Sequence, residues 1–172
     1  MLNRWFRRAD PARLRVLMVC TGNICRSPMA EAVLRQRLQR AGLERVVAVD
    51  SAGTHGFHKG SPIDPRAAAQ AALRGYTLDG LRSRPVVAED YSRFDLLLAM
   101  DQDNLATLRK RCPPEEQHRL QLLMAHAPQA GATEVPDPYY GALSGFDLAL
   151  DLIEPACDGL MQEVRRRLAA PA

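Results

Sequence analysis

Hydrophobic and polar residues alternate along the chain in two distinct patterns. Short runs of apolar residues predict buried strands, and between them apolar residues recur every three or four positions, as in an amphipathic helix. The apolar runs predict strands at residues 13–20, 45–53, 94–100 and 118–125. The helical spacing predicts helices at residues 28–42, 64–75, 101–112 and 144–169, with a loop rich in Pro and Gly over residues 127–143.

Two of these helices carry local signals. Ser27 is expected to cap the first helix, Pro28 suits its first position and Gly42 suits its C-terminal end. Pro155 lies inside the last predicted helix and is expected to kink it. The first helix therefore begins a few residues after the apolar run that ends at Cys20.

The alternation of strands and helices is typical of an α/β fold with a mainly parallel sheet and right-handed crossovers. We therefore expect a single-domain three-layer sandwich, in which helices cover both faces of a central four-stranded parallel sheet. Residues 14–170 form the expected domain and residues 1–13 a basic N-terminal extension. Ligands in such folds bind beyond the carboxyl ends of the strands, and Cys20 lies at such an end.

Composition excludes several classes of protein. The chain has 172 residues, 47% of them hydrophobic, and no apolar run approaches the ~18 residues of a membrane span. The net charge of +3 arises in residues 1–15, where five arginines and one aspartate give +4, so the remaining residues sum to −1. A basic excess confined to a tail does not favour nucleic-acid binding. Without an apolar stretch of signal-peptide length near the N-terminus, we expect a cytoplasmic protein.

The cysteines predict neither a disulfide framework nor a metal site. The chain contains Cys20, Cys25, Cys112 and Cys157. A disulfide framework is not expected in a chain of this length without a signal peptide. No C-x-x-C pair is present, and the four histidines do not cluster with cysteines at zinc-binding spacing.

The segment CTGNICRS, residues 20–27, places a thiol and a guanidinium around a short loop that leads into a helix. Unpaired N–H groups at a helix N-terminus bind anions, and a thiol placed there ionises readily. The planar guanidinium of Arg26 matches two oxygens of a phosphate. The segment, here named the Cys–Arg loop, therefore predicts that Cys20 is a thiolate nucleophile for the phosphorus of a bound phosphate.

Other residues of the Cys–Arg loop suit this chemistry. Gly22 permits close approach of the backbone to the anion, and Asn23 tolerates the left-handed dihedrals that inward-facing amides require. Ser27 can donate a hydrogen bond to the Cys20 thiolate. The full predicted phosphate-binding set is Thr21, Gly22, Asn23, Ile24, Cys25, Arg26 and Ser27.

A departing alcohol needs a proton, and the candidate acid lies far along the chain. Asp137, in the segment VPDPYYG, is flanked by Pro136 and Pro138, which stiffen its backbone. By itself, an aspartate in a Pro-rich loop indicates turn formation. In the presence of the Cys–Arg loop, Asp137 is predicted to be the general acid.

CTGNICRS, the segment DSAGT at residues 50–54 and DPYYG at residues 137–141 together resemble the low-molecular-weight protein tyrosine phosphatases, over about residues 14–168. The resemblance implies that Cys20 becomes the phosphocysteine, that Arg26 binds phosphate, and that Asp137 acts as acid and then as base. It also implies loop support from Asn23, Ser27 and Ser51, and a slot for an aromatic ring walled by Ile24, Phe57, Tyr139 and Tyr140.

The resemblance further implies chemistry without a metal or other cofactor, because backbone amides and Arg26 replace magnesium as the positive charge around the phosphoryl group. The implied substrates are phosphotyrosine-containing proteins, with a bacterial tyrosine kinase as a candidate partner. Neither nucleic acid nor stable membrane insertion is expected.

This chain departs from the resemblance at two positions. Many relatives have a histidine, which completes the Asn–Ser network, where this chain has Leu81, and often a tryptophan where it has Phe57. Asp101 matches a position of these relatives whose role the sequence does not define.

Three alternatives use the same segment. An arsenate reductase needs two further cysteines close together, whereas Cys112 and Cys157 are far apart in the sequence. A phosphoarginine phosphatase tends to carry threonine where this chain has Ile24. A non-catalytic phosphopeptide-binding module would lack the nucleophile or the acid, and both are present.

Cys25 lies in the same tight loop as Cys20. A curled loop can bring two cysteines within disulfide range, and a nearby thiol can trap the sulfenic acid that peroxide forms on a thiolate. We therefore expect Cys20 and Cys25 to form a redox pair; the alternative is that Cys25 only packs against the sheet.

Overall fold

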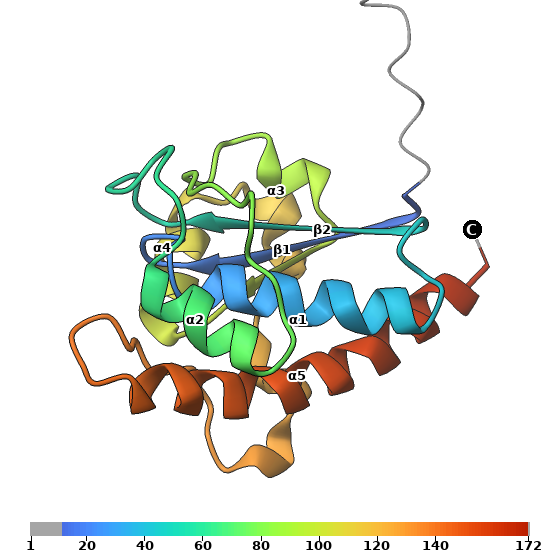
Figure 1. Ribbon diagram of the computed structural model, residues 1–172. Helices are drawn as coiled ribbons and strands as arrows, with labels where there is room; N and C mark the ends of the chain where they lie inside the picture. Colours follow the sequence, from blue (N-terminus) through green and yellow to red (C-terminus); the bar gives the residue numbers. More distant parts are fainter. Residues whose placement is uncertain (1–11, 172) are drawn as a thin grey trace, which may run out of the picture.

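The computed structural model describes residues 12–171, so residues 1–11 of the expected extension lie outside the described part of the chain. At its centre is a sheet of four parallel strands in the order β2-β1-β3-β4 (Figure 1). The strands are β1 (Leu14–Cys20), β2 (Val47–Gly53), β3 (Leu96–Ala99) and β4 (Leu120–Leu122).

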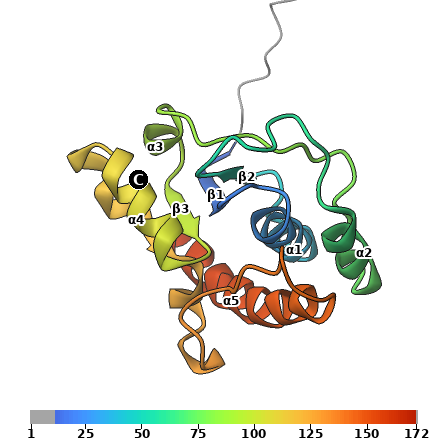
Figure 2. The same cartoon turned by 90° about the vertical axis from the view of Figure 1, so that its left-hand side faces the viewer.

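Helices cover both faces of this sheet (Figures 1 and 2). One face carries α1 (Arg26–Arg40), α2 (Pro65–Leu73) and α5 (Ser144–Ala169), and the other carries α3 (Asp90–Arg93) and α4 (Gln102–Arg111). Three short 3-10 segments flank β4: η1 (Pro114–Arg119), η2 (Leu123–His126) and η3 (Pro128–Ala130). The predicted three-layer α/β sandwich is confirmed. None of the helices within residues 12–171 is long and apolar enough to cross a bilayer.

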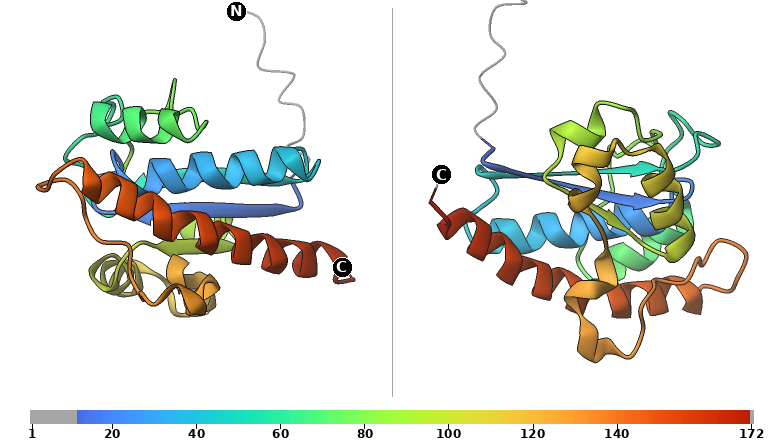
Figure 3. Two further views of the ribbon diagram at one scale, coloured as in Figure 1. Left: turned by 60° about the horizontal axis from the view of Figure 1, so that its bottom comes forward. Right: turned by 180° about the vertical axis from the view of Figure 1, so that it is seen from behind.

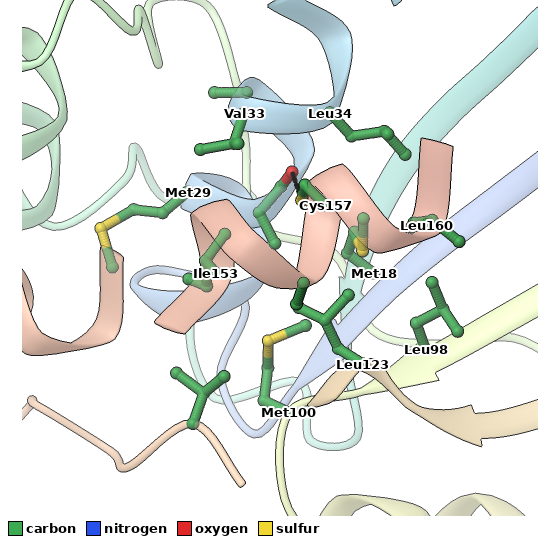
Figure 4. Close-up of a cluster of buried hydrophobic side chains, with 14 of the residues drawn as sticks. Met18, Met29, Val33, Leu34, Leu98, Met100, Leu123, Ile153, Cys157 and Leu160 are labelled. Atoms are coloured by element: carbon green, nitrogen blue, oxygen red, sulfur yellow. Dashed lines mark hydrogen bonds between the residues drawn. The ribbon is translucent and has the colours of Figure 1, made fainter. Parts of the chain in front are cut away.

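Strand β1 is buried on both faces, which explains its uninterrupted apolar run. Val16 and Met18 belong to the larger core cluster, with α1 and α5, whereas Leu17 and Val19 belong to a second cluster, with α4. In the larger cluster, side chains of the sheet meet those of α1 and α5 (Figure 4), among them Met18, Leu34, Leu98 and Leu160. Helix α5 runs alongside α1 over much of its length (Figure 3).

The start of α1 differs from the prediction. The residue before the helix is Cys25, which makes no side-chain capping hydrogen bond, and Ser27 lies inside the first turn. The prediction that Ser27 caps the helix was wrong, because the helix begins within the Cys–Arg loop and the Ser27 hydroxyl contacts the Cys20 sulfur instead. At the other end, Gly42 follows the helix with φ of 68°, as expected for a helix stop.

Two other elements differ from the predicted pattern. Only Leu120–Leu122 pairs with β3, because the residues on either side of this short strand form the 3-10 segments η1 and η2. The single turn of α3 was not predicted. In contrast, α5 has the predicted bounds and continues through Pro155 without interruption.

Gly159 marks a close approach between α5 and η2. A Cβ atom at this position would overlap the carbonyl oxygen of His126, a backbone atom that cannot rotate away. We expect Gly159→Ala to lower the free energy of unfolding by about 2 kcal/mol, because an overpacking cost of about 3 kcal/mol outweighs the ~1 kcal/mol gain in helix propensity. Urea unfolding measures the change.

The matched control is Gly56→Ala, whose added Cβ would meet only Pro85 at 3.7 Å, an ordinary contact. Its stability should stay close to that of the wild type. Equal stability of the Gly159→Ala and Gly56→Ala variants would contradict the close approach.

Candidate active site

A pocket of about 160 Å³ opens at the carboxyl end of β1, where the chain turns into α1. This is the left-hand end of the sheet in Figure 1. The pocket is lined by Cys20, Thr21, Gly22, Ile24, Cys25, Arg26, Phe57, His58, Asp137, Tyr139 and Tyr140. It thus joins the predicted nucleophile, phosphate-binding arginine, acid and aromatic slot, which come from three separate parts of the chain.

The Cys20 side chain is buried at the end of β1, and two polar groups face its sulfur. The backbone N–H of Asn23 donates to Sγ at 3.3 Å, and Ser27 Oγ lies 3.0 Å from it. Asn23 reaches this position with φ of 55°, which turns its N–H group inward. Both contacts stabilise negative charge on the sulfur.

Beneath the Cys–Arg loop, the Asn23 side chain connects Ser27 and Ser51, the two other residues predicted to support the loop. Its Nδ2 donates to Ser27 Oγ at 2.8 Å and to Ser51 Oγ at 3.0 Å. Ser51 Oγ in turn donates to Oε2 of Glu31 at 2.5 Å. Glu31 was not predicted from the sequence; burial raises the pKa of its carboxyl, and the hydrogen bond from Ser51 opposes that shift.

The Arg26 guanidinium is held by hydrogen bonds on the side that faces away from the pocket. Its Nη1 donates to Asp101 Oδ2 at 2.5 Å and to the carbonyl oxygen of Val135 at 3.0 Å, and the residue is only 2% exposed. Nη2 lies toward the pocket, 3.5 Å from Asp137 Oδ2. Burial disfavours the charge, but Cys20 and Asp101 nearby raise the pKa of Arg26 above its ordinary value, so the guanidinium stays ionised.

Asp101 has two structural contacts. Besides binding Arg26, its Oδ1 accepts from the backbone N–H of Asn104 at 2.7 Å and caps α4. The Asn104 side chain donates to Thr21 Oγ1 at 3.0 Å. The start of α4 is therefore tied to both ends of the Cys–Arg loop.

The segment after Leu81 holds the other side of the loop. Ser83 Oγ donates to the carbonyl oxygen of Gly22 at 2.9 Å, and the backbone N–H of Arg84 donates to Asn23 Oδ1 at 3.0 Å. Leu81 itself is half-buried against the larger core cluster. The Asn23 amide thus has partners at both its oxygen and its nitrogen without a histidine at this position.

Asp137 lies on the wall of the pocket. Its side chain is 44% exposed, and its Oδ1 accepts from the backbone N–H of Tyr139 at 3.1 Å. This bond directs the carboxylate across the pocket toward Arg26. The Asp137 carboxylate is therefore open to the pocket and to solvent but held in one orientation.

Aromatic side chains form the rim. Tyr139 and Tyr140 meet edge to face at 4.8 Å between ring centroids, and Phe57 stacks on His55 at 4.9 Å. Phe57 is 74% exposed and Tyr140 is 93% exposed, so both can cover a flat ligand at little cost. His58, which the sequence analysis did not select, also lines the pocket.

Several functional partners escaped sequence reasoning because they belong to other elements. The sequence analysis marked Asp101 as a position shared with relatives, but nothing in the sequence indicated that its side chain binds Arg26. Glu31 and Arg84 gave no local signal, since one lies in an ordinary helical pattern and the other in a loop. Within residues 12–171 no group of three His, Cys, Asp or Glu side chains could hold a metal ion.

An α/β sandwich with a thiol and a buried arginine at the carboxyl end of its first strand has the architecture of a phosphatase. The family model of low molecular weight phosphotyrosine protein phosphatases matches residues 15–170. A low molecular weight protein-tyrosine-phosphatase of Streptomyces coelicolor is 45% identical over 161 residues, which cover 92% of this chain and 98% of that protein. The chain therefore belongs to the low molecular weight protein tyrosine phosphatases, a family of hydrolases.

Two further comparisons agree with this family assignment. The low molecular weight protein-tyrosine phosphatase A of Mycobacterium bovis is 42% identical over 163 residues, covering 94% of this chain and 96% of that protein. A crystal structure of a protein tyrosine phosphatase from Entamoeba histolytica, with Hepes in the active site, has a TM-score of 0.87 at 40% identity. It covers 89% of this chain and 97% of that chain.

Proposed function

We propose that this phosphatase hydrolyses phosphotyrosine through a phosphocysteine at Cys20, without a metal ion. The observation that carries the proposal is the environment of the Cys20 sulfur, which has the Asn23 N–H and the Ser27 hydroxyl within 3.3 Å at the base of the pocket. The buried, charged Arg26 supplies the positive charge that a transferring phosphoryl group requires.

In the first step the Cys20 thiolate forms a bond to phosphorus as the bond from phosphorus to the phenolic oxygen breaks. Asp137 gives its proton to that oxygen, so tyrosine leaves as a neutral phenol. In the second step the Asp137 carboxylate takes a proton from water, whose oxygen bonds to phosphorus. The sulfur then leaves as a thiolate, stabilised by Ser27, and inorganic phosphate is released.

The alternatives are less well supported. Cys112 belongs to the core cluster that contains α4, whereas Cys157 lies in the larger cluster on the other face of the sheet. Neither is placed to exchange disulfides with Cys20, as an arsenate reductase requires. Ile24 offers no hydrogen-bonding group to a phosphoguanidine, so phosphotyrosine remains the favoured substrate over phosphoarginine.

The exposed aromatic rim favours a phosphotyrosine ring on a protein surface. We therefore infer that the substrates are phosphotyrosine-containing proteins, with a bacterial tyrosine kinase as the candidate partner, and that the enzyme acts in the cytoplasm. The kinase and the location rest on the sequence resemblance alone.

A substrate panel tests the proposed function. Phosphotyrosine peptides are expected to be hydrolysed, whereas matched phosphoserine peptides and phosphoarginine should react at least about a hundredfold more slowly, because neither presents a flat phenyl ring to the slot. Dialysis against EDTA should leave kcat unchanged. Loss of activity in EDTA, restored by a divalent ion, would contradict chemistry without a metal, and faster hydrolysis of phosphoarginine would contradict the substrate class.

We also propose that Cys20 and Cys25 form the redox pair. Both line the pocket, whereas Cys112 and Cys157 are buried elsewhere. Burial, followed by the negative charge of Asp64, raises the pKa of the Cys25 thiol, so Cys20 is the thiol that peroxide attacks first. Peroxide converts the Cys20 thiolate to a sulfenic acid, and the Cys25 sulfur displaces its hydroxyl as water to form the disulfide.

Peroxide is therefore expected to inactivate the enzyme reversibly, with dithiothreitol restoring activity and bound phosphate protecting it. Cys25→Ser should make most of the loss irreversible, because the sulfenic acid then oxidises further. Cys112→Ser is the matched control and should behave as the wild type. Peptide mapping that finds Cys20 bonded to Cys112 or Cys157, or only as sulfinic acid beside a free Cys25, would exclude the pair.

A further inference from the structure

Glu31 is a buried carboxylate with no part in the steps above, yet hydrogen bonds connect it to the reacting sulfur. The residue is 1% exposed, and its Oε2 accepts from Ser51 Oγ at 2.5 Å. Ser51 Oγ lies 3.0 Å from Asn23 Nδ2, which lies 2.8 Å from Ser27 Oγ. Ser27 Oγ lies 3.0 Å from Cys20 Sγ. These contacts form a continuous series of hydrogen bonds from Glu31 on α1, through Ser51, Asn23 and Ser27, to the Cys20 sulfur. We name this series the Glu31 chain.

The chemistry of the groups fixes the donor at each link. An ionised carboxylate only accepts, so the Ser51 hydroxyl must donate to Glu31. The Ser51 oxygen then accepts one proton of the Asn23 amide, and the other proton goes to Ser27. Because the Ser27 oxygen is an acceptor at Asn23, its own proton is available to the Cys20 thiolate. The Ala52 carbonyl oxygen, at 3.4 Å from Ser27 Oγ, is the more distant acceptor.

Arg35 holds the carboxylate that starts this chain. Its Nη2 donates to Glu31 Oε1 at 2.5 Å and to the carbonyl oxygen of Val49 at 2.9 Å. Val49 lies on β2 two residues before Ser51, so one guanidinium fixes Glu31 against the strand that carries Ser51. Both carboxylate oxygens of Glu31 are therefore engaged, one by Arg35 and one by Ser51.

We propose that Glu31 is a positioning residue for the nucleophile: its charge holds the Ser51 hydroxyl as a donor, so that the Ser51 oxygen is left to accept from the Asn23 amide. The amide held in this way donates to Ser27, whose own proton then points at the Cys20 sulfur. The proposal rests on the proposed function, in which Cys20 carries the phosphoryl group. A thiolate that accepts this hydrogen bond leaves phosphorus more readily in the second step. The loop amides and Arg26 bind phosphate independently of the chain, so Glu31 acts on kcat more than on KM.

Glu31→Gln tests this role because it keeps the shape of the side chain and removes the charge. A glutamine cannot satisfy both neighbours. With its oxygen toward Arg35, its nitrogen donates to Ser51, and the reverse orientation sets two donors against each other. We expect kcat for p-nitrophenyl phosphate to fall about tenfold, with KM and inhibition by inorganic phosphate changed by less than about twofold. Arg40→Met removes an exposed charge from the same helix and should keep the wild-type kcat.

A double variant separates positioning from a general effect on folding. If Glu31 and Ser51 act through one chain, Glu31→Gln combined with Ser51→Ala should lose no more kcat than the more damaging single change. Urea unfolding checks that each variant is folded. Should Glu31→Gln not fold, Arg35→Met, at a half-exposed side chain, carries the test with the same expected direction in kcat. Multiplied losses in the double variant, or an unchanged kcat in the folded single variant, would overturn the proposal.

Alkylation of Cys20 by iodoacetamide examines the Glu31 chain without any turnover. The rate at Cys20, followed by fragment mass spectrometry, is expected to fall in Glu31→Gln, because a thiol that loses a hydrogen bond to its charged form is less often ionised. A wild-type chain without phosphatase activity would overturn the proposed function. Equal alkylation rates in wild type and Glu31→Gln would overturn the role of Glu31 instead.

Discussion

Cys20→Ser is expected to abolish hydrolysis of p-nitrophenyl phosphate while leaving phosphate binding intact. A serine hydroxyl at this position is not ionised, so the attack on phosphorus loses its nucleophile. We expect a fall in kcat of more than about a thousandfold, which corresponds to roughly 4 kcal/mol of activation free energy. Phosphate binding, measured by calorimetry, should persist because the loop amides and Arg26 remain in place.

The comparison with two other variants makes this result specific. Cys112→Ser changes a buried cysteine outside the pocket and should retain the wild-type kcat. Arg26→Ala should lose both catalysis and phosphate binding; urea unfolding must accompany it, because it leaves Asp101 without its cation. A Cys20→Ser variant that keeps more than about a thousandth of the rate would contradict covalent catalysis.

Asp137→Ala is expected to slow substrates according to the quality of their leaving group. Phosphotyrosine, whose phenolate is a poor leaving group, should lose about 10²–10⁴-fold in kcat/KM, the usual contribution of a general acid. Aryl phosphates whose phenols are strongly acidic leave without a proton and should be affected far less. A series of substituted phenyl phosphates measures the slope of rate against leaving-group acidity.

The position of Asp137 is suited to this test, since its side chain is partly exposed and its removal opens no cavity in the core. Asp103→Asn, an exposed acid in the first turn of α4, provides a control for loss of a negative charge and should leave the slope unchanged. Equal slowing of all substrates by Asp137→Ala would remove this residue from the role of acid.

The sequence predicted those features of the site that are written within one short segment. Cys20, Asn23 and Arg26 are neighbours in the chain, so their chemistry could be judged together before any fold was known. Asp137 could be selected only because the Cys–Arg loop was already recognised, since an aspartate in a Pro-rich loop by itself indicates a turn. The alternation of apolar runs and helical spacing was likewise sufficient for the layers of the sandwich.

The partners that hold these residues could not be predicted, because their contacts are made only when distant elements pack. Asp101 meets Arg26 from the end of β3, and the Arg84 amide meets Asn23 from a loop that passes beside β2. For Ser27 a local sequence rule gave a prediction that the fold overrides. The type and position of this residue satisfy the rule for a helix cap, but the loop places it in the first turn, where the sulfur is its partner.

The most direct test of the account is to stop the reaction during turnover and locate the phosphoryl group. Wild-type enzyme mixed with a phosphotyrosine peptide is quenched in acid within the first turnover, digested and analysed by fragment mass spectrometry. The account predicts a phosphoryl group on the sulfur of Cys20, present in Asp137→Ala as well and absent in Cys20→Ser. Release of tyrosine and phosphate in the same turnover with no phosphorylated cysteine, or with the phosphoryl group on another residue, would contradict it.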